Sequence, residues 1–266
     1  MWRTAYWGPP RGEARRALME TRDRVIAVGR HRNDLWVVSK ALTAAAIYDL
    51  IWIGPGAALK GCRELFDLSR ETQDPRPKCM GLWVMAVAKS ITGAYEEAIE
   101  DADEALRVSL CPVDRYAAAA AKSIGYAFSG RAREGRAMLE ETVASWQRGG
   151  LHMNRMDVEA GLGTAMVLTG DMAAGVRHVE EASRRFEALG QPFARAVGDL
   201  FLGRIYAEIA FGGDRPPVPV IFRNLLFFLT TVPVAARKAR RCLESALHEY
   251  RDLDVPYGVA ASLFEL

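Results

Sequence analysis

The chain has 266 residues, of which 50% are hydrophobic and 26% charged, the balance of a folded globular protein. Its 35 Lys and Arg against 33 Asp and Glu leave a formal charge of +2, which gives no overall field to attract nucleic acid or an anionic membrane. Only four histidines and four cysteines leave little for a metal site or a nucleophile, so the composition leaves open a helical interaction protein or an enzyme with a carboxylate-only site.

The N-terminal residues carry no apolar stretch and no small-residue cleavage pattern, so we expect no secretory signal and a cytoplasmic protein. A basic helix is predicted from Arg11 to Arg30, followed by a helix from Asp34 to Ile53. We therefore expect residues 1–34 to form an N-terminal helix or cap and residues 35–266 to form a repeat region of about five helical hairpins.

Four glycines recur at spacings of 37, 37 and 40 residues, and each is followed five residues later by another small residue. Small residues at a fixed phase let two helices approach closely, because no side chain holds their backbones apart. The pattern predicts an all-α, right-handed α-solenoid of antiparallel helix hairpins. The predicted turn glycines are Gly56, Gly93, Gly130 and Gly170, and the small residues that follow them are Gly61, Ala98, Gly135 and Gly175.

The repeat resembles the tetratricopeptide repeat, best at Gly93-x-Tyr95-x-x-Ala98 with Ala105 beyond it. That family has a period of about 34 residues, so this chain would hold degenerate repeats with longer turns. The resemblance implies a concave surface that binds a protein or peptide and is lined mainly by the first helix of each hairpin. Candidate lining residues are the polar positions of those helices, Lys89, Lys122, Glu159 and Arg204.

One second helix is strongly acidic, and Ala98, Ala102 and Ala105 mark its inward face. We expect the acids to form a solvated outer face, since a paired-carboxylate active site would need residues that converge from other elements. The acids are Glu96, Glu97, Glu100, Asp101, Asp103 and Glu104.

The last repeat is interrupted. Five positions of the fourth unit have counterparts 64 residues later, whereas the first helices are only 40 residues apart, which leaves a 24-residue insertion near 211–238. It opens with a Gly- and Pro-rich loop at Gly212–Pro217 and continues as one short apolar helix from Val220 to Leu229. The paired positions are Gly175, Ala182, Phe186, Leu189 and Pro192, which match Ala239, Ala246, Tyr250, Leu253 and Pro256.

Two interpretations of the insertion compete. In the first, its helix packs across the solenoid or caps its end, burying Phe222, Leu225, Leu226, Phe228 and Leu229. In the second, residues 218–241 are a docking segment whose apolar face rests on a partner or a membrane surface. Acidic groups of that partner or membrane would then contact Arg237, Lys238, Arg240 and Arg241. The candidate binding residues of the segment are Phe222, Phe228, Arg237 and Arg241.

No motif indicates a metal or a cofactor. No two histidines lie four residues apart, and no phosphate-binding glycine loop is present, so we expect no metal, no cofactor and no nucleic-acid partner. The closing stretch from Tyr257 to Leu266 is expected to cap the repeats. The cysteines, expected to be reduced and at least half-buried, are Cys62, Cys79, Cys111 and Cys242, and the tryptophans expected to anchor the core are Trp36, Trp52, Trp83 and Trp146.

The C-terminal half, from about Met153, also resembles the helical-repeat region of bacterial class III adenylate/guanylate cyclases, in which a cyclase domain and an ATPase precede tetratricopeptide-like repeats. The resemblance implies a non-catalytic, detached or regulatory part of a cyclase-type signalling protein, or a gene fragment, because no cyclase or ATPase motif is present. An alternative is a cyclase component whose activity needs a separate catalytic chain. The resemblance is carried by Gly203–Tyr206, Phe222–Leu225, Ala235–Arg241 and Leu253–Pro256.

Overall fold

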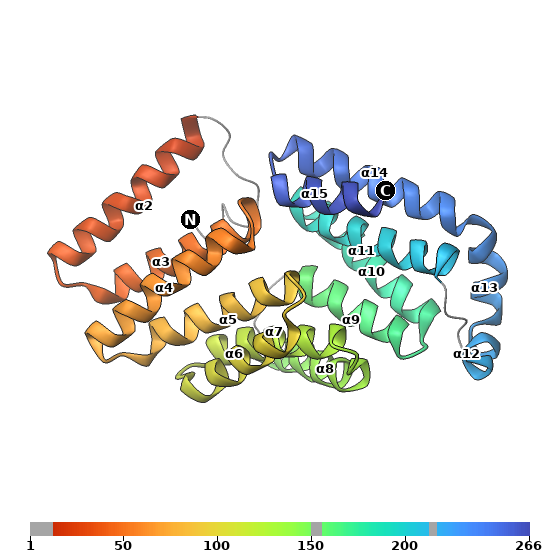
Figure 1. Cartoon of the computed structure of the whole chain (residues 1–266), viewed down its shortest axis with the longest axis horizontal. Coiled ribbons are helices and arrows are strands. Elements are labelled where there is room, and N and C mark those ends of the chain that lie inside the picture. Colours follow the sequence, from red (N-terminus) through yellow and green to blue (C-terminus); the bar gives the residue numbers. More distant parts are fainter. Residues whose placement is uncertain (1–12, 150–155, 213–216) are drawn as a thin grey trace. The chain divides into compact units, whose positions relative to one another are not determined.

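The computed structural model describes residues 13–149, 156–212 and 217–266, and every regular element among them is helical (Figure 1). The all-α class predicted from the sequence is confirmed. The expectation about the N-terminal leader concerns residues outside the described ranges, as does most of the predicted loop at 212–217.

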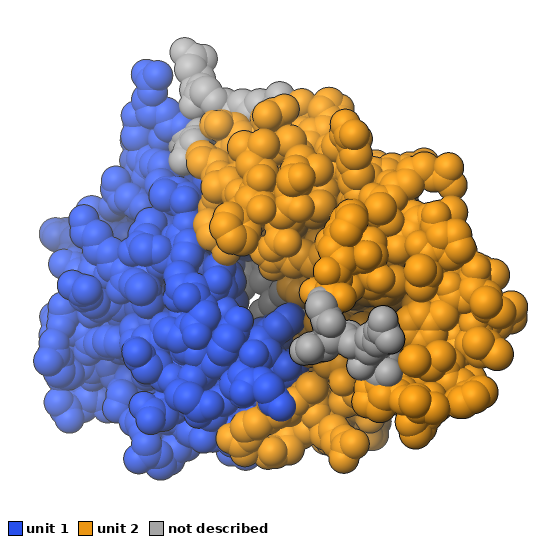
Figure 2. Space-filling model, turned by 45° about the vertical axis from the view of Figure 1, so that its right-hand side comes forward, with its two compact units in different colours: residues 1–130 blue, residues 131–266 orange. Residues whose placement is uncertain are grey.

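The helices form two compact units, residues 1–130 and residues 131–266, coloured blue and orange in Figure 2. Each unit has its own cluster of buried apolar residues.

In the first unit, successive helices pack against one another across short turns, and α5 also contacts α3 and α7. The predicted inward face of the acidic helix is confirmed, since Ala98, Ala102 and Ala105 are fully buried. The elements are α2 (Glu13–His31), α3 (Leu35–Trp52), α4 (Pro55–Thr72), α5 (Pro75–Ile91), α6 (Tyr95–Val108) and α7 (Pro112–Phe128).

The second unit continues the same scheme. Each of its long helices packs on the next, and α11 contacts α14 across the insertion as well as α9, α10 and α15. The elements are α8 (Ala132–Arg148), α9 (Met156–Leu168), α10 (Met172–Ala188), α11 (Pro192–Phe211), α12 (Val218–Arg223), α13 (Leu225–Thr231), the 3₁₀ helix η1 (Val232–Val234), α14 (Ala235–Asp252) and α15 (Pro256–Glu265).

Three of the four predicted turn glycines lie in turns. Gly93, Gly130 and Gly170 have φ values of 84°, 87° and 90°, a left-handed conformation that favours glycine. The prediction for Gly56 is wrong: it lies in the first turn of α4, because Pro55 already begins that helix. Gly54, with φ 134°, occupies the turn instead.

Close packing at small residues is confirmed between α9 and α10. A Cβ on Gly163 would lie 2.3 Å from Val179 Cγ2, and a Cβ on Gly175 would lie 2.5 Å from the Gly163 carbonyl oxygen. The two backbones can approach this closely only because neither glycine carries a side chain.

The 64-residue correspondence at the end of the chain is also confirmed. Pro192 and Pro256 begin α11 and α15, and the turns before them place Gly190 at φ 66° and Asp254 at φ 55°. The closing hydrogen bonds match: the amide of Gln191 donates to the Phe186 carbonyl (3.0 Å), and that of Val255 donates to the Tyr250 carbonyl (2.9 Å).

The tryptophan prediction is correct for three of the four rings. Trp52, Trp83 and Trp146 are buried, whereas Trp36 is 58% exposed. Trp36 lies in the first turn of α3, and the Lys40 ammonium is 5.9 Å from its ring centre, so this ring is at the start of a helix and outside the core.

Within the described residues, α3 is the one helix whose length and apolar composition would suffice to cross a membrane. Twelve of its 18 residues are buried in this structure, where α2, α4 and α5 pack around it. That burial is the pattern of a core helix.

Candidate functional site

The insertion forms two short helices instead of the single one predicted. The break falls at Asn224, which ends α12 and precedes α13 with a φ of −112°. Asn224 is only 5% exposed, although it interrupts an apolar run. Its side chain turns inward and competes with the regular helical hydrogen bonds, which explains the break.

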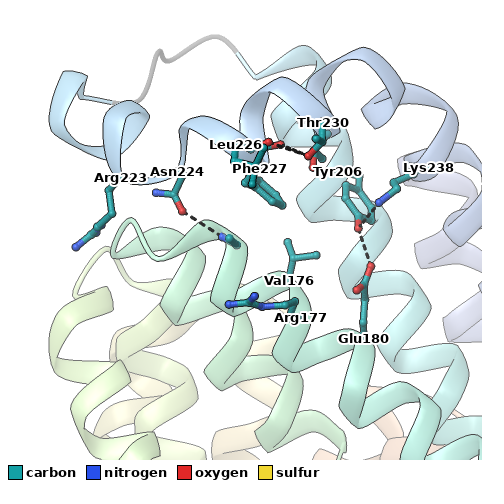
Figure 3. A pocket seen from close by; sticks show the side chains of 12 residues that line it. Val176, Arg177, Glu180, Tyr206, Arg223, Asn224, Leu226, Phe227, Thr230 and Lys238 are labelled. Carbon is teal, nitrogen blue, oxygen red and sulfur yellow. Dashed lines mark hydrogen bonds between the residues drawn. The ribbon is translucent and has the colours of Figure 1, made fainter.

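Asn224 fastens the insertion to the turn between α9 and α10. Its Nδ2 donates to the carbonyls of Gly170 (2.8 Å) and Val220 (2.9 Å), and its Oδ1 accepts from the Ala173 amide (3.2 Å). Ala173 lies in the first turn of α10, whose amides have no partner within the helix. Figure 3 shows Asn224 directed at that helix end.

The same turn receives the neighbouring side chains. Arg223 lies 3.4 Å from Asp171 Oδ1, and a Cβ on Gly170 would meet Val220 Cγ2 at 2.9 Å. The hydrogen bond from Arg136, assisted by the charge of Arg223, holds the pKa of Asp171 below its ordinary value. Because Gly170 has no side chain, Val220 of α12 can pack directly on this turn.

The outer face of the insertion is apolar and exposed. Phe222, Leu226 and Leu229 are 72%, 75% and 66% exposed, so the interpretation in which this face is buried is wrong. The physical reason is that Asn224 and Phe227 take the inward positions, which turns the larger apolar set outward. We call this set the apolar surface: Val218, Phe222, Leu225, Leu226, Leu229 and Val232.

Phe227 and Phe228 are both half-buried, and their rings meet edge to face with centres 5.9 Å apart. Phe227 packs against the core cluster that contains Val176 and Tyr206. The predicted binding residue Phe228 is therefore partly covered, unlike Phe222.

A pocket of about 350 Å³ lies beside Phe227, where α10, α11, α12, α13 and α14 meet. Figure 3 shows Phe227 pointing from α13 toward Val176 of α10. The pocket is lined by Ala173, Val176, Arg177, Glu180, Tyr206, Arg223, Asn224, Leu226, Phe227, Thr230, Thr231 and Lys238.

Tyr206 connects two charged side chains of the pocket, Glu180 and Lys238. Its hydroxyl donates to Glu180 Oε1 (2.9 Å) and accepts from Lys238 Nζ (3.2 Å), while the Lys238 ammonium lies 4.8 Å from the ring centre. Burial, together with the nearby Glu180 carboxylate, raises the pKa of Tyr206. The phenol therefore stays protonated and orders both neighbours.

The predicted lining residues of the first unit are held in ion pairs with the acidic helix. Lys89 Nζ lies 2.6 Å from Asp101 and 3.3 Å from Glu97, and Lys122 Nζ lies 2.6 Å from Asp103. Burial outweighs the contact with Lys89 and raises the pKa of Asp101. Both lysines thus join neighbouring helices.

The prediction that the acids of this helix form a solvated outer face is confirmed for four of the six acids. Asp101 and Glu104 are half-buried, and Glu104 accepts from Lys78 at 2.6 Å. The remaining acids are exposed: Glu96, Glu97, Glu100 and Asp103.

The residues of the second unit that were predicted to line a concave surface, Glu159 and Arg204, also form ion pairs with neighbouring helices. Glu159 lies 2.8 Å from His178 Nε2 and 2.5 Å from Arg185, and Arg204 lies 2.7 Å from Glu265. Burial alone would raise the pKa of Glu159, but the hydrogen bond from His178 and the charge of Arg185 lower it overall.

The predicted binding residues Arg237 and Arg241 are exposed on α14, and Arg240 pairs with Glu244 at 2.8 Å. The sequence does not mark Arg177, Glu180 and Tyr206 as pocket residues, because they line the pocket only through the way α13 folds over α10. The one available signal was Asn224, a polar residue inside an apolar run.

Among the described residues, no group of three or more His, Cys, Asp or Glu side chains gathers as metal ligands would. All four cysteines are free, with Cys62 and Cys79 buried and the other two half-buried, as predicted. Burial raises the pKa of Cys62 and Cys79 to about 12, which keeps these thiols protonated and poor nucleophiles.

A comparison of this sequence with known protein families and with curated proteins finds no match.

Proposed function

We propose that this chain is a non-catalytic helical-repeat module, related in design to tetratricopeptide repeats, that binds a protein or peptide through its apolar surface. The observation that carries the proposal is the exposure of Phe222, Leu226 and Leu229 on a segment that Asn224 fixes to the turn between α9 and α10. A large apolar face that is held outward, and not folded inward, is typical of an interaction site.

The concave site beside the apolar surface favours a protein over a lipid surface. A partner segment can lay apolar side chains on α12 and α13 and insert one side chain into the pocket next to Leu226. A bilayer would contact the exposed apolar face of α12 and α13 but has no side chain to insert into the pocket.

The test selects binding peptides from a random displayed library with the intact protein and measures their Kd by fluorescence anisotropy. The variant Phe222→Ser/Leu226→Ser/Leu229→Ser is expected to weaken binding at least about tenfold, because three exposed anchors are removed. The matched control removes the same residue types from other exposed positions, in Leu110→Ser/Leu263→Ser/Phe264→Ser. Equal Kd values for both triple variants would refute the proposal.

A membrane-surface adaptor is the second candidate, favoured by the exposed cations Arg223 on α12 and Arg237 and Arg241 on α14, the helix that follows the insertion in the chain. It predicts flotation with vesicles of phosphatidylcholine and phosphatidylserine that the first triple variant abolishes. Vesicle binding of this kind without any peptide binding would replace the protein-partner proposal.

The resemblance at Gly203–Tyr206 and Ala235–Arg241 supports a wider proposal: a cytoplasmic, regulatory part of a bacterial cyclase-type signalling protein. The chain itself is then expected to form no cyclic nucleotide. Incubation of the purified protein with ATP or GTP and Mg²⁺ tests this, and cyclic nucleotide above the level of a boiled control would overturn it.

A further inference from the structure

We propose that the pocket beside Phe227 receives a carboxylate side chain of the partner, so that the partner segment is acidic as well as apolar. This inference rests on the proposed function, because it assigns the chemistry of the segment that covers the apolar surface.

The pocket and the apolar surface are continuous. Leu226 belongs to both, since its side chain is 75% exposed and also lines the pocket. A segment that rests on Leu226 therefore places its next side chain at the pocket mouth. Ala173, Val176 and Phe227 supply apolar walls for the methylene groups of that side chain.

The polar groups of the pocket select a negative charge. Arg177 comes from α10, Arg223 from α12 and Lys238 from α14, so three separate elements bring cations to one place. Glu180 is the one acid in the lining, and it already accepts a hydrogen bond from Tyr206. Charge complementarity across an interface disfavours partners of the wrong charge and fixes the position of the right partner.

Arg177 is the cation best placed to respond to a ligand. Its side chain is exposed and makes no ion pair within the described part of the chain, whereas Arg223 shares the charge of Asp171 at 3.4 Å. A guanidinium presents a fork of donors that matches the two oxygens of a carboxylate.

The engaged groups of the pocket favour a single negative charge. Glu180 and Lys238 are both bound to the Tyr206 hydroxyl and Arg223 lies against Asp171, so Arg177 is the lining cation left to pair with one carboxylate. The volume of about 350 Å³ lies at the small end of ligand pockets, which suits a single Asp or Glu side chain.

The experiment uses the peptides selected with the intact protein. Arg177→Ala is expected to weaken peptide binding about tenfold, the effect of losing a hydrogen bond to a charged group. Arg184→Ala is the matched control, since Arg184 is also exposed on α10 but does not line the pocket. Its Kd should stay within about twofold of the unmodified protein. Circular dichroism checks that both variants keep their helices.

A second arm changes the peptide. Replacing its key Asp or Glu by Asn or Gln should weaken binding to the unmodified protein about tenfold and leave no further effect of Arg177→Ala, because both changes remove the same contact. Higher salt should reduce the difference in Kd between the acidic peptide and its Asn or Gln variant.

The outcomes separate the two proposals. Peptides that depend on Phe222, Leu226 and Leu229 but contain no acid, or that bind equally well to Arg177→Ala, would overturn the carboxylate site and leave the apolar docking surface standing. Failure to select any peptide that depends on those three residues, or binding to vesicles alone, would overturn both.

Discussion

Gly56 and Gly93 hold the same position in the sequence repeat but differ in backbone conformation. Gly93 has a φ of 84° in the turn before α6, whereas Gly56 lies inside the first turn of α4. Neither would bring a new Cβ within 4 Å of another group, so packing does not enter the comparison.

Alanine should therefore act with opposite sign at these two positions. Gly93→Ala is expected to lower the free energy of unfolding by about 1–2 kcal/mol, because an L-residue resists the left-handed conformation. Gly56→Ala should raise it by up to about 1 kcal/mol, because alanine favours the helix. Urea unfolding followed by circular dichroism measures both. Shifts of the same sign would contradict the turn assignment.

Glu159 makes stability depend on pH. His178 and Arg185 lower its pKa in the folded protein below the ordinary 4.5, so its contribution is present above that pH and is lost as the pH falls through the folded pKa. Glu159→Gln should be less stable than the unmodified protein at pH 7, and the difference should shrink toward zero in acid.

Thermal unfolding of both proteins from pH 7 down to the acid limit tests this expectation. Glu181→Gln is the control, since Glu181 is exposed on α10 and forms no ion pair with another described residue. A stability difference for Glu159→Gln that is constant with pH would show that the ion pairs do not stabilise the fold.

At the scale of elements, the contact of α9 with α10 reverses the usual effect of glycine in a helix. Helix propensity alone predicts that Gly163→Ala stabilises the protein. The structure predicts destabilisation by about 1–3 kcal/mol, because the new Cβ would lie 2.3 Å from Val179 Cγ2 and 2.9 Å from the Gly175 carbonyl oxygen. A raised melting temperature for Gly163→Ala would show that the helices are not packed this closely.

The hydrogen bonds of Asn224 to the turn between α9 and α10 can be tested directly. Asn224→Ala leaves the Gly170 carbonyl and the Ala173 amide without their present partner, a loss of about 1–3 kcal/mol. Amide hydrogen exchange in residues 218–231 is expected to speed up about tenfold or more, whereas α9 should keep its protection.

Thr230→Ala is the control for this experiment. Thr230 lies on the same insertion but donates only to carbonyls of its own helix, at Leu226 and Phe227. Equal exchange in Asn224→Ala and Thr230→Ala would mean that Asn224 does not anchor the segment.

The helices could be predicted from the sequence, but the direction in which the insertion turns its apolar side chains could not. The 64-residue correspondence located Pro256 and the start of α15, because helix starts and turns are encoded locally. Whether Phe222 points inward depends on Asn224 and on Gly170, which is 54 residues away. No local pattern records such a contact. The ion pairs of Lys89 and Glu159 were missed for the same reason, since each joins two helices.

At the scale of the whole molecule, each unit carries its own buried core, and stacked helices take their stability from their nearest neighbours. The division falls between Gly130 and Arg131, in the turn that joins α7 and α8. The helices that hold the insertion, which are α9, α10, α11 and α14, all belong to the second unit.

Residues 131–266 produced alone should therefore fold. We expect a helical circular dichroism spectrum, a cooperative thermal transition, and slow amide exchange in α10, α11 and α14, because the contacts among these helices all lie within the second unit. The fragment should also protect residues 218–231 as the full chain does, since Gly170 and Ala173 are retained. A fragment that begins at Met172 is the matched control: it lacks α8, α9 and the turn that receives Asn224, and should lose that protection. An unfolded 131–266 fragment would show that the second unit depends on residues 1–130 for its stability.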